Sequence, residues 1–136
     1  MNLFGPRAFK EKNYKQKELE LYTSLQTFRS ILQRDELENG CYLVGQTDKS
    51  YRACFNLCFG LLKFYTKHKD EAKEYQFKRN FLLSKTRGIF MDQKKYETKI
   101  VACYLIEPSK LDRMINEYYN MFKVEKLFQE LKEETK

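Results

Sequence analysis

The most constraining feature of this sequence is a long apolar stripe with helical spacing between residues 50 and 67. Apolar side chains recur there at steps of three and four residues, which places them on one face of an α-helix. A second pattern competes, because the apolar residues from Ala53 to Phe59 also alternate as they would in a β-strand. Gly60 weakens a helix by about 1 kcal/mol relative to alanine, but the longer match favours a helix. The stripe consists of Tyr51, Cys54, Phe55, Cys58, Leu61, Leu62 and Tyr65.

Three further segments have helical periodicity: residues 13–37, 69–84 and 109–133. Asn39-Gly40 is expected to end the first helix, because glycine commonly follows a helix terminus. Asp70 and Glu71 are expected in the first turn of the second, where acidic side chains suit the helix dipole. Ser109 and Asp112 resemble a capping box at the start of the last one.

Short apolar runs predict strands at residues 41–44, 89–91 and 100–106. A helix break at residues 85–88 precedes the second run, and a polar loop at 92–98 follows it. The third run is β-branched and almost wholly apolar, which indicates a central strand. We therefore expect an α+β fold with three to four helices packed on a small, mainly antiparallel sheet. A mostly α-helical fold is the alternative.

The length of 136 residues fits a single domain. We expect a basic flexible arm at residues 1–12, interrupted by Gly5 and Pro6, and one α+β domain at 13–136. No apolar stretch approaches the roughly 18 residues of a membrane span, and the first residues lack the apolar core of a secretory signal. The sequence thus predicts an intracellular, cytoplasmic protein without a membrane partner, and leaves nucleoid or nuclear association open.

Positive charge is distributed unevenly along the chain, whose formal net charge is +7. Residues 63–99 carry 11 Lys and Arg against 5 Asp and Glu, and residues 1–17 carry 5 against 1, whereas 18–62 and 100–136 are slightly acidic at −2 and −1. Clustered cations can neutralise nucleic-acid phosphates. The predicted phosphate contacts are Lys78, Arg79, Lys85, Arg87, Lys94, Lys95 and Lys99, with Arg7, Lys10 and Lys12 from the arm.

Aromatic residues interleave with this basic segment, namely Phe77, Phe81, Phe90 and Tyr96. Rings beside cations suit single-stranded nucleic acid, whose bases stack on aromatic side chains. The opposing interpretation is that these rings belong to the core and the lysines only solvate the surface. No finger spacing, aromatic RNA-binding motif or basic region before a heptad repeat accompanies the charge.

Catalytic and metal-binding motifs are weak in this chain. His68, the one histidine, has no recognisable nucleophile near it, and no phosphate-binding glycine loop is present. Asp92 followed by Glu97-Thr98-Lys99 is similar to the Asp…Glu-x-Lys pattern of metal-dependent restriction-type nucleases, which makes an Mg²⁺-dependent nuclease a remote alternative. A solvated hairpin loop is the preferred interpretation. Four cysteines, Cys41, Cys54, Cys58 and Cys103, are expected to be buried thiols and not a zinc site.

The predicted C-terminal helix has apolar residues on more than one face, so it is a candidate interface for a protein partner or a second copy of the chain. Packing on two sides within its own domain is the alternative. We therefore expect a small non-enzymatic accessory protein, without cofactor, metal or evident small-molecule substrate, whose basic surface contacts nucleic acid or a nucleoprotein complex. The alternative is an interaction module that docks on a larger protein machine, such as a virus- or plasmid-encoded inhibitor. The interface residues are Tyr118, Tyr119, Phe122 and Phe128.

Overall fold

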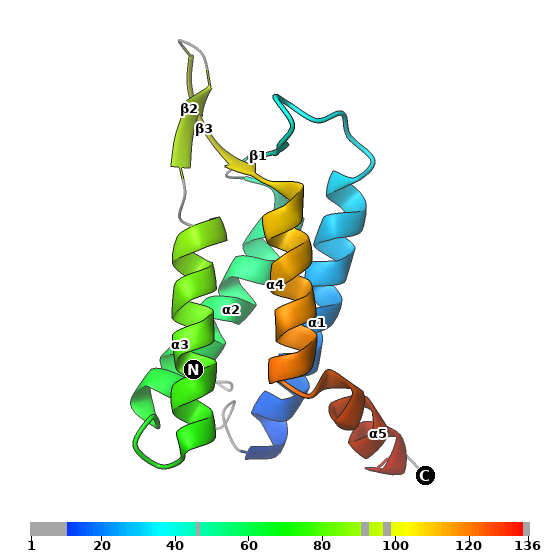
Figure 1. Ribbon diagram of the computed structural model, residues 1–136, viewed down its shortest axis with the longest axis vertical. Helices are drawn as coiled ribbons and strands as arrows, with labels where there is room; N and C mark the ends of the chain where they lie inside the picture. The colour runs from blue at the N-terminus through cyan, green and yellow to red at the C-terminus, as the bar shows by residue number, and fades with distance from the viewer. Residues whose placement is uncertain (1–10, 46, 91–92, 97–98, 135–136) are drawn as a thin grey trace, which may run out of the picture.

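Four helices lie side by side in this protein, and a small sheet covers one end of them (Figure 1). The computed structural model describes residues 11–45, 47–90, 93–96 and 99–134. A fifth helix, α5, leaves the opposite end. The helices are α1 (Glu11–Leu32), α2 (Lys49–Lys67), α3 (Lys73–Lys85), α4 (Pro108–Met121) and α5 (Val124–Glu134), and the strands are β1 (Tyr42–Gly45), β2 (Gln93–Tyr96) and β3 (Lys99–Ile106).

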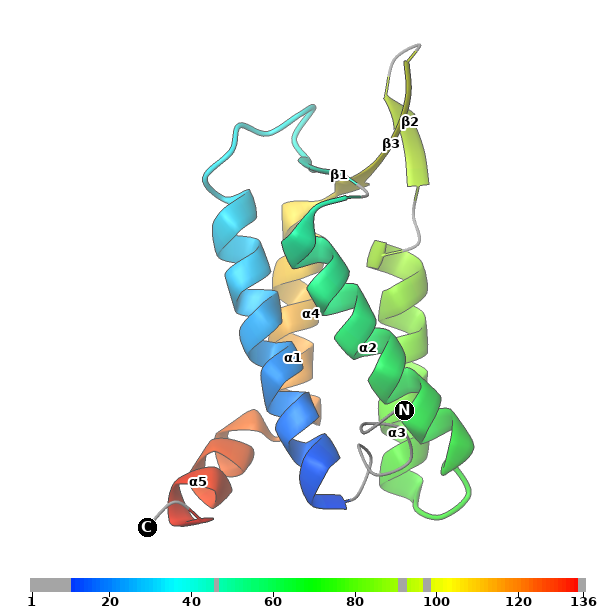
Figure 2. The same cartoon turned by 180° about the vertical axis from the view of Figure 1, so that it is seen from behind.

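The sheet has three strands in the order β1-β3-β2, and both pairs are antiparallel. The expected α+β class with an antiparallel sheet is confirmed, and so is the central strand predicted at residues 100–106. β2 and β3 form a hairpin that stands out beyond the helices (Figure 2). Among the described residues, every helix is too short or too polar to serve as a membrane span.

The helix predicted at residues 50–67 is confirmed by α2, and the alternative prediction of a strand there is wrong. The side chain of Asp48 caps the helix, because its Oδ1 accepts a hydrogen bond from the Tyr51 backbone N–H at 3.0 Å. The inner face of α2 carries the predicted stripe into the core of the bundle. Its buried members are Tyr51, Cys54, Cys58, Leu61 and Tyr65, with Phe64 beside them.

The first helix ends earlier than predicted, at Leu32 and not near residue 37. Asn39 and Gly40 do not end that helix. Both have positive φ, +53° and +78°, and they form a tight turn in which the backbones of Glu38 and Cys41 exchange two hydrogen bonds. Asn-Gly is the preferred sequence for such a turn, because both central residues need positive φ. The dipeptide therefore marks a hairpin-type turn leading into β1.

The chain stays helical where a break at 85–88 and a strand at 89–91 are predicted. Thr86–Phe90 continues α3 as a π-helical turn with Thr86, Ile89 and Phe90 buried. Contacts with α2 hold this turn: the Tyr51 hydroxyl donates to the Phe90 carbonyl, and Cys58 Sγ lies 3.0 Å from Thr86 Oγ1. The strand prediction was wrong because tertiary packing outweighs local propensity here. Met91 lies outside the described residues.

Three smaller boundaries also differ from expectation. α3 begins at Lys73, so Asp70 and Glu71 lie in the turn before it. The predicted polar loop at 92–98 contains strand β2. Glu107 and not Ser109 caps α4, without a side-chain capping bond, and Pro108 occupies its first turn.

The predicted helix at 109–133 is two helices, which explains why there are five helices in the described residues and not three or four. α4 ends at Met121, and Lys123 takes a left-handed backbone with φ of +50° before α5 begins. Glycine is the usual residue at this position after a helix. The sequence offers no glycine there, so periodicity alone could not reveal the break.

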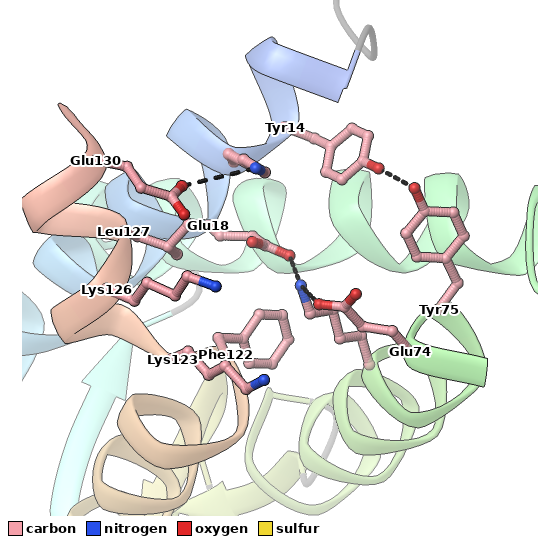
Figure 3. Close-up of a pocket in the computed structure, with 11 residues that line it drawn as sticks. Tyr14, Glu18, Glu74, Tyr75, Phe122, Lys123, Lys126, Leu127 and Glu130 are labelled. Carbon is pink, nitrogen blue, oxygen red and sulfur yellow. Dashed lines mark hydrogen bonds and ion pairs between the residues drawn. The ribbon is translucent and has the colours of Figure 1, made fainter. Parts of the chain in front are cut away.

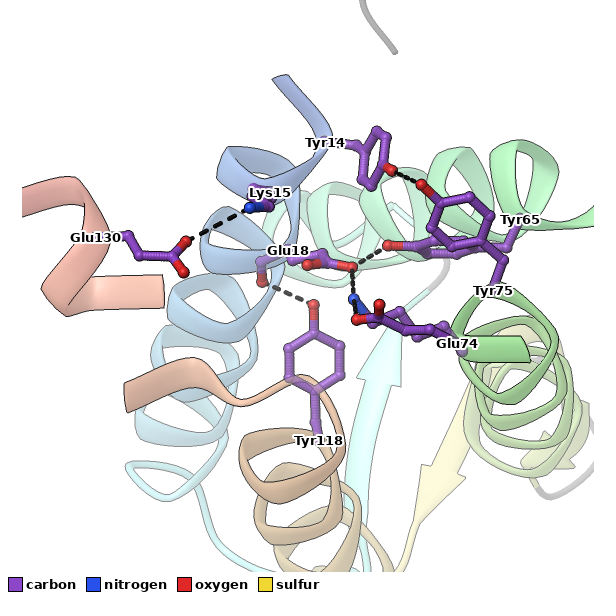
Figure 4. Close-up of polar contacts among 9 residues, drawn as sticks. Tyr14, Lys15, Glu18, Tyr65, Glu74, Tyr75, Tyr118 and Glu130 are labelled. Atoms are coloured by element: carbon purple, nitrogen blue, oxygen red, sulfur yellow. Dashed lines mark hydrogen bonds and ion pairs between the residues drawn. The ribbon is translucent and has the colours of Figure 1, made fainter. Parts of the chain in front are cut away.

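A buried ion pair lies where α1, α2, α3 and α4 meet (Figure 4). Glu18 of α1 is fully buried, and its Oε2 accepts hydrogen bonds from Lys78 Nζ of α3 at 2.8 Å and from the Tyr65 hydroxyl of α2. The Tyr118 hydroxyl of α4 donates to the Glu18 backbone carbonyl at 2.7 Å. Glu74 Oε1 lies 3.0 Å from Lys78 Nζ on the outer side. Each of the four helices therefore contributes to one polar cluster.

Burial dominates the electrostatics of this cluster. Desolvation raises the pKa of Glu18, against the opposing effects of Lys78 and the Tyr65 hydroxyl. The hydrogen bond from Lys78 lowers the pKa of the more exposed Glu74. Lys78 Nζ also lies 5.2 Å from the ring centre of Phe122, within cation–π range. The ammonium is thus surrounded by carboxylates and rings.

Replacing Lys78 by methionine should destabilise the fold, because it leaves the Glu18 carboxylate in the interior without its cation. Removing one partner of a buried pair costs about 3–5 kcal/mol. Urea unfolding followed by circular dichroism measures the loss. Lys69→Met, in the exposed turn after α2, is the control and should change stability by less than about 0.5 kcal/mol. Equal midpoints for the two variants would contradict the proposed role of the pair.

Candidate nucleic-acid interface

The cations predicted to contact phosphate do not share one surface. Lys78 is 6% exposed and lies between Glu18 and Glu74. Its charge is already matched by two carboxylates, so the expectation that it contacts phosphate is corrected. A helical lysine in a charged segment looks the same in sequence whether its partner is solvent or a glutamate 60 residues away.

The next three predicted contacts differ from one another in exposure. Lys85 Nζ pairs with Glu117 Oε2 of α4 at 2.8 Å, and its side chain is largely covered. Arg79 is half-buried and donates from Nη1 to Asn80 Oδ1 at 2.9 Å. Arg87 is exposed on the π-helical turn. Of this group, Arg87 is the most accessible cation.

Lys94, Lys95 and Lys99 belong to one hairpin. The register pairs Lys94 with Cys103 and Lys95 with Ala102, and Lys99 is the first residue of β3. In the arm, Arg7 and Lys10 lie outside the described residues. Lys12 falls in the first turn of α1, so residues 11 and 12 are helical and not part of an irregular arm.

The outer face of α2 is a positive surface that the segment charges did not reveal. α2 contains four basic residues and no acidic residue. All four are exposed, and none forms an ion pair with a described residue. Two of them fall within residues 18–62, where acidic residues outside α2 make the net charge negative. The four are Lys49, Arg52, Lys63 and Lys67.

A ladder of aromatic rings runs along the same helix. Phe59 is 48% exposed and stacks on Phe55 at 5.8 Å between ring centres. Phe55 stacks on Tyr51 at 6.1 Å, and Tyr51 stacks on Tyr104 of β3 at 5.0 Å. Neighbouring planes differ by 17–23°. The four-residue spacing within α2 aligns the rings, and the last of them presents an open face to solvent.

A groove of about 530 Å³ lies beside this ladder. Its apolar wall consists of the rings of Tyr51, Phe55, Phe90 and Tyr104, and Arg52 and Asn56 supply polar groups at its side. In Figure 2, α2 faces the viewer, and the hairpin with its three lysines stands beyond the end at which α2 begins. The groove therefore joins two basic elements through an aromatic surface.

Two of the four residues predicted to contact a partner are buried, and the other two are half-buried or exposed. Tyr118 and Phe122 are 0% and 2% exposed and stack on each other at 4.0 Å within the core. These two residues face the interior, so the expectation that they contact a partner is corrected. Tyr119 is half-buried and Phe128 is exposed, and both rings lie near Tyr22 of α1.

The cysteine thiols are reduced and mostly buried. Burial raises the pKa of Cys54 to about 12 and that of Cys58 to about 11, the latter opposed by its hydrogen bond with Thr86. No group of three or more His, Cys, Asp or Glu residues in the described part of the chain could hold a metal ion. Asp92 and Glu97, the acidic residues of the nuclease alternative, lie outside the described residues.

No known protein family, curated protein or solved structure matches this chain.

Cys54 and Cys58 should not react with a thiol reagent in the native state. With pKa values of about 12 and 11, about one thiol in a thousand or fewer is ionised at pH 8. Titration with Ellman's reagent at pH 8 measures this directly. The double variant Cys54→Ala, Cys58→Ala should release the same number of fast-reacting equivalents as the native protein, and fewer only after unfolding. A smaller native signal from the double variant would contradict burial of these thiols.

Proposed function

We propose that this protein binds single-stranded nucleic acid along the outer face of α2 and the β2–β3 hairpin, as a non-enzymatic accessory protein. The observation that carries the proposal is the aromatic ladder ending at exposed Phe59, set among four cations without ion pairs to described residues. Rings and cations that recur along one face are the two components of single-strand binding.

Electrostatics supports a phosphate-bearing ligand. Lys49 and Arg52 lie one helical turn apart near the start of α2, and Lys63 and Lys67 lie one turn apart near its end. α2 is about 28 Å long at 1.5 Å per residue, so a strand that follows it would meet cations near both ends. The β2–β3 hairpin, whose sequence includes Lys94, Lys95 and Lys99, lies past the start of the helix (Figure 2).

Stacking supports single strands over a duplex. Phe59 has an accessible ring face, and the groove beside Phe55 and Tyr104 has apolar walls with polar groups at its side. Bases in a duplex are already stacked on each other and cannot reach such a surface, whereas unpaired bases can. Arg52 and Asn56 are placed to donate hydrogen bonds to a phosphate or to a base edge in the groove.

Phe59→Ala should weaken binding of a single-stranded oligonucleotide without unfolding the protein. Loss of one stacked base costs about 1–3 kcal/mol, or roughly 5–150-fold in Kd. Fluorescence anisotropy with labelled single-stranded and duplex DNA and RNA at low salt measures it. Phe77→Ala is a matched control, because Phe77 is 63% exposed on α3 and outside the groove. No binding by the native protein, or equal losses from both variants, would overturn the proposal.

Reversing charge on α2 should weaken binding and reduce its salt dependence. For single strands, the slope of log K against log salt changes by about 0.7 for each phosphate contact. Arg52→Glu with Lys63→Glu should therefore reduce the slope by about 1.4. The control pair is Lys110→Glu with Arg113→Glu, exposed on α4 on the opposite side of the molecule. An unchanged slope in the α2 variant would place any binding site elsewhere.

A further inference from the structure

The buried carboxylate of Glu18 has one oxygen with two partners and one with none. Oε2 receives hydrogen bonds from Lys78 and Tyr65, whereas Oε1 has no hydrogen-bond partner among the described residues. Glu18 is 0% exposed. Buried polar atoms are nearly always hydrogen-bonded, and one left unpaired is costly. This acceptor therefore needs a donor from outside the described protein groups.

A cavity of about 220 Å³ lies beside Glu18, between α1, α3 and the elbow that joins α4 to α5 (Figure 3). Phe122 and Leu127 supply apolar surface, and the hydroxyls of Tyr14 and Tyr75 are hydrogen-bonded to each other at another wall. This volume is many times what one water needs. The cavity can accept a small organic molecule.

The lysines that line the cavity outnumber the glutamates, four to three. Lys15 pairs with Glu130 at 3.6 Å, and Lys78 pairs with Glu18 and Glu74. Lys123 and Lys126 are exposed and form no ion pair with a described residue. Figure 3 shows the Lys126 amino group directed toward the middle of the lining residues and the Lys123 amino group beside the Phe122 ring. The charge of Lys123 acts on Glu74 without a short ion pair between them. Two cations without ion pairs to described residues and one acceptor without a donor define the groups that a ligand must offer.

We propose that this cavity binds a small anion that also carries a hydroxyl group. The anionic group lies between Lys123 and Lys126, and the hydroxyl donates to Glu18 Oε1. A phosphate ester of a small polyol has this chemistry, and so does a hydroxylated carboxylate. An amine is a poorer donor, because it would place a second cation beside Lys78 Nζ. The site is separate from the α2 face and does not depend on it.

Isothermal titration calorimetry with glycerol 3-phosphate, glycerate, inorganic phosphate and glycerol tests the proposal. The hydroxylated anions should bind at least tenfold more tightly than inorganic phosphate, and uncharged glycerol should not bind. The relative affinities of glycerol 3-phosphate and glycerate distinguish a phosphate site from a carboxylate site. No binding of either anion, or equal binding of inorganic phosphate, would overturn the proposal.

Two variants and two controls assign the binding to this cavity. Lys123→Gly removes one amino group while suiting the left-handed backbone, φ +50°, so its thermal midpoint should be unchanged or higher and its affinity about tenfold lower. Lys126→Gln should lose a similar factor. Lys110→Gln, exposed and outside the cavity, is the control, and Phe59→Ala should also bind normally. Equal affinity of Lys123→Gly, Lys126→Gln and the control would overturn the assignment.

The Glu18→Gln variant tests the inner contact. Its amide oxygen can accept from Lys78 and Tyr65, which leaves an N–H₂ donor at the place of Oε1. The ligand hydroxyl would then accept from a neutral amide and would lose its charge-assisted hydrogen bond to a carboxylate. The preference for glycerol 3-phosphate over inorganic phosphate should then fall, because a neutral hydrogen bond is weaker than a charge-assisted one. A folded Glu18→Gln variant that keeps the full preference would contradict the hydroxyl contact. If the variant fails to fold, Lys123→Gly and Lys126→Gln still decide the proposal.

Discussion

The Glu18–Lys78 pair is the constraint on which the arrangement of the helices depends. An ammonium and a carboxylate are costly to remove from water unless they are paired with each other and hydrogen-bonded to further groups. Here α1 supplies the carboxylate, α3 the ammonium, α2 the Tyr65 hydroxyl, and α4 the Tyr118 hydroxyl that donates to the backbone of Glu18. Apolar contacts persist when one helix shifts slightly along another. Hydrogen bonds are lost in such a shift, because they require a narrow range of donor–acceptor distances. The polar cluster therefore sets the mutual height of four helices in a way that the surrounding apolar contacts alone would not.

The same cluster determines which side of α2 meets solvent. Tyr65 and Cys58 point inward to Glu18 and Thr86, which fixes the rotation of the helix about its axis. The residues left on the outside include Arg52, Asn56, Phe59 and Lys63, at steps of four, three and four. The interior pairing also takes Lys78 away from the surface. Among the described side chains, α2 therefore presents four exposed cations without ion pairs, whereas Lys78 and Lys85 of α3 are held in ion pairs, although α3 lies in the most basic part of the sequence.

The sequence predicts those helices and strands in which the spacing of apolar residues follows directly from the face that is buried. The stripe in α2 and the β-branched run of β3 are of this kind, because each is dictated by its own residues. The π-helical turn at Thr86–Phe90 is not, since it depends on contacts with Tyr51 and Cys58 of another helix. The candidate site also depends on contacts between segments that are distant in the sequence. Charge can be counted along a segment, but whether Lys85 meets solvent or Glu117 depends on packing. The net charge of residues 18–62 does not reveal Lys49 and Arg52, because the acidic residues that balance them lie outside α2.

The break at Lys123 connects the fold to the cavity. A continuous helix over residues 109–133 would carry Lys126, Leu127 and Glu130 away from the bundle. The elbow instead turns α5 back against α1, where Glu130 meets Lys15 and Leu127 is buried. A left-handed backbone costs a residue other than glycine about 1–2 kcal/mol, and this lysine occupies a position where glycine would avoid that cost. Strained residues of this kind concentrate at functional sites. Lys123 and Glu18 both line the cavity, so the left-handed residue and the unpaired carboxylate oxygen belong to one site.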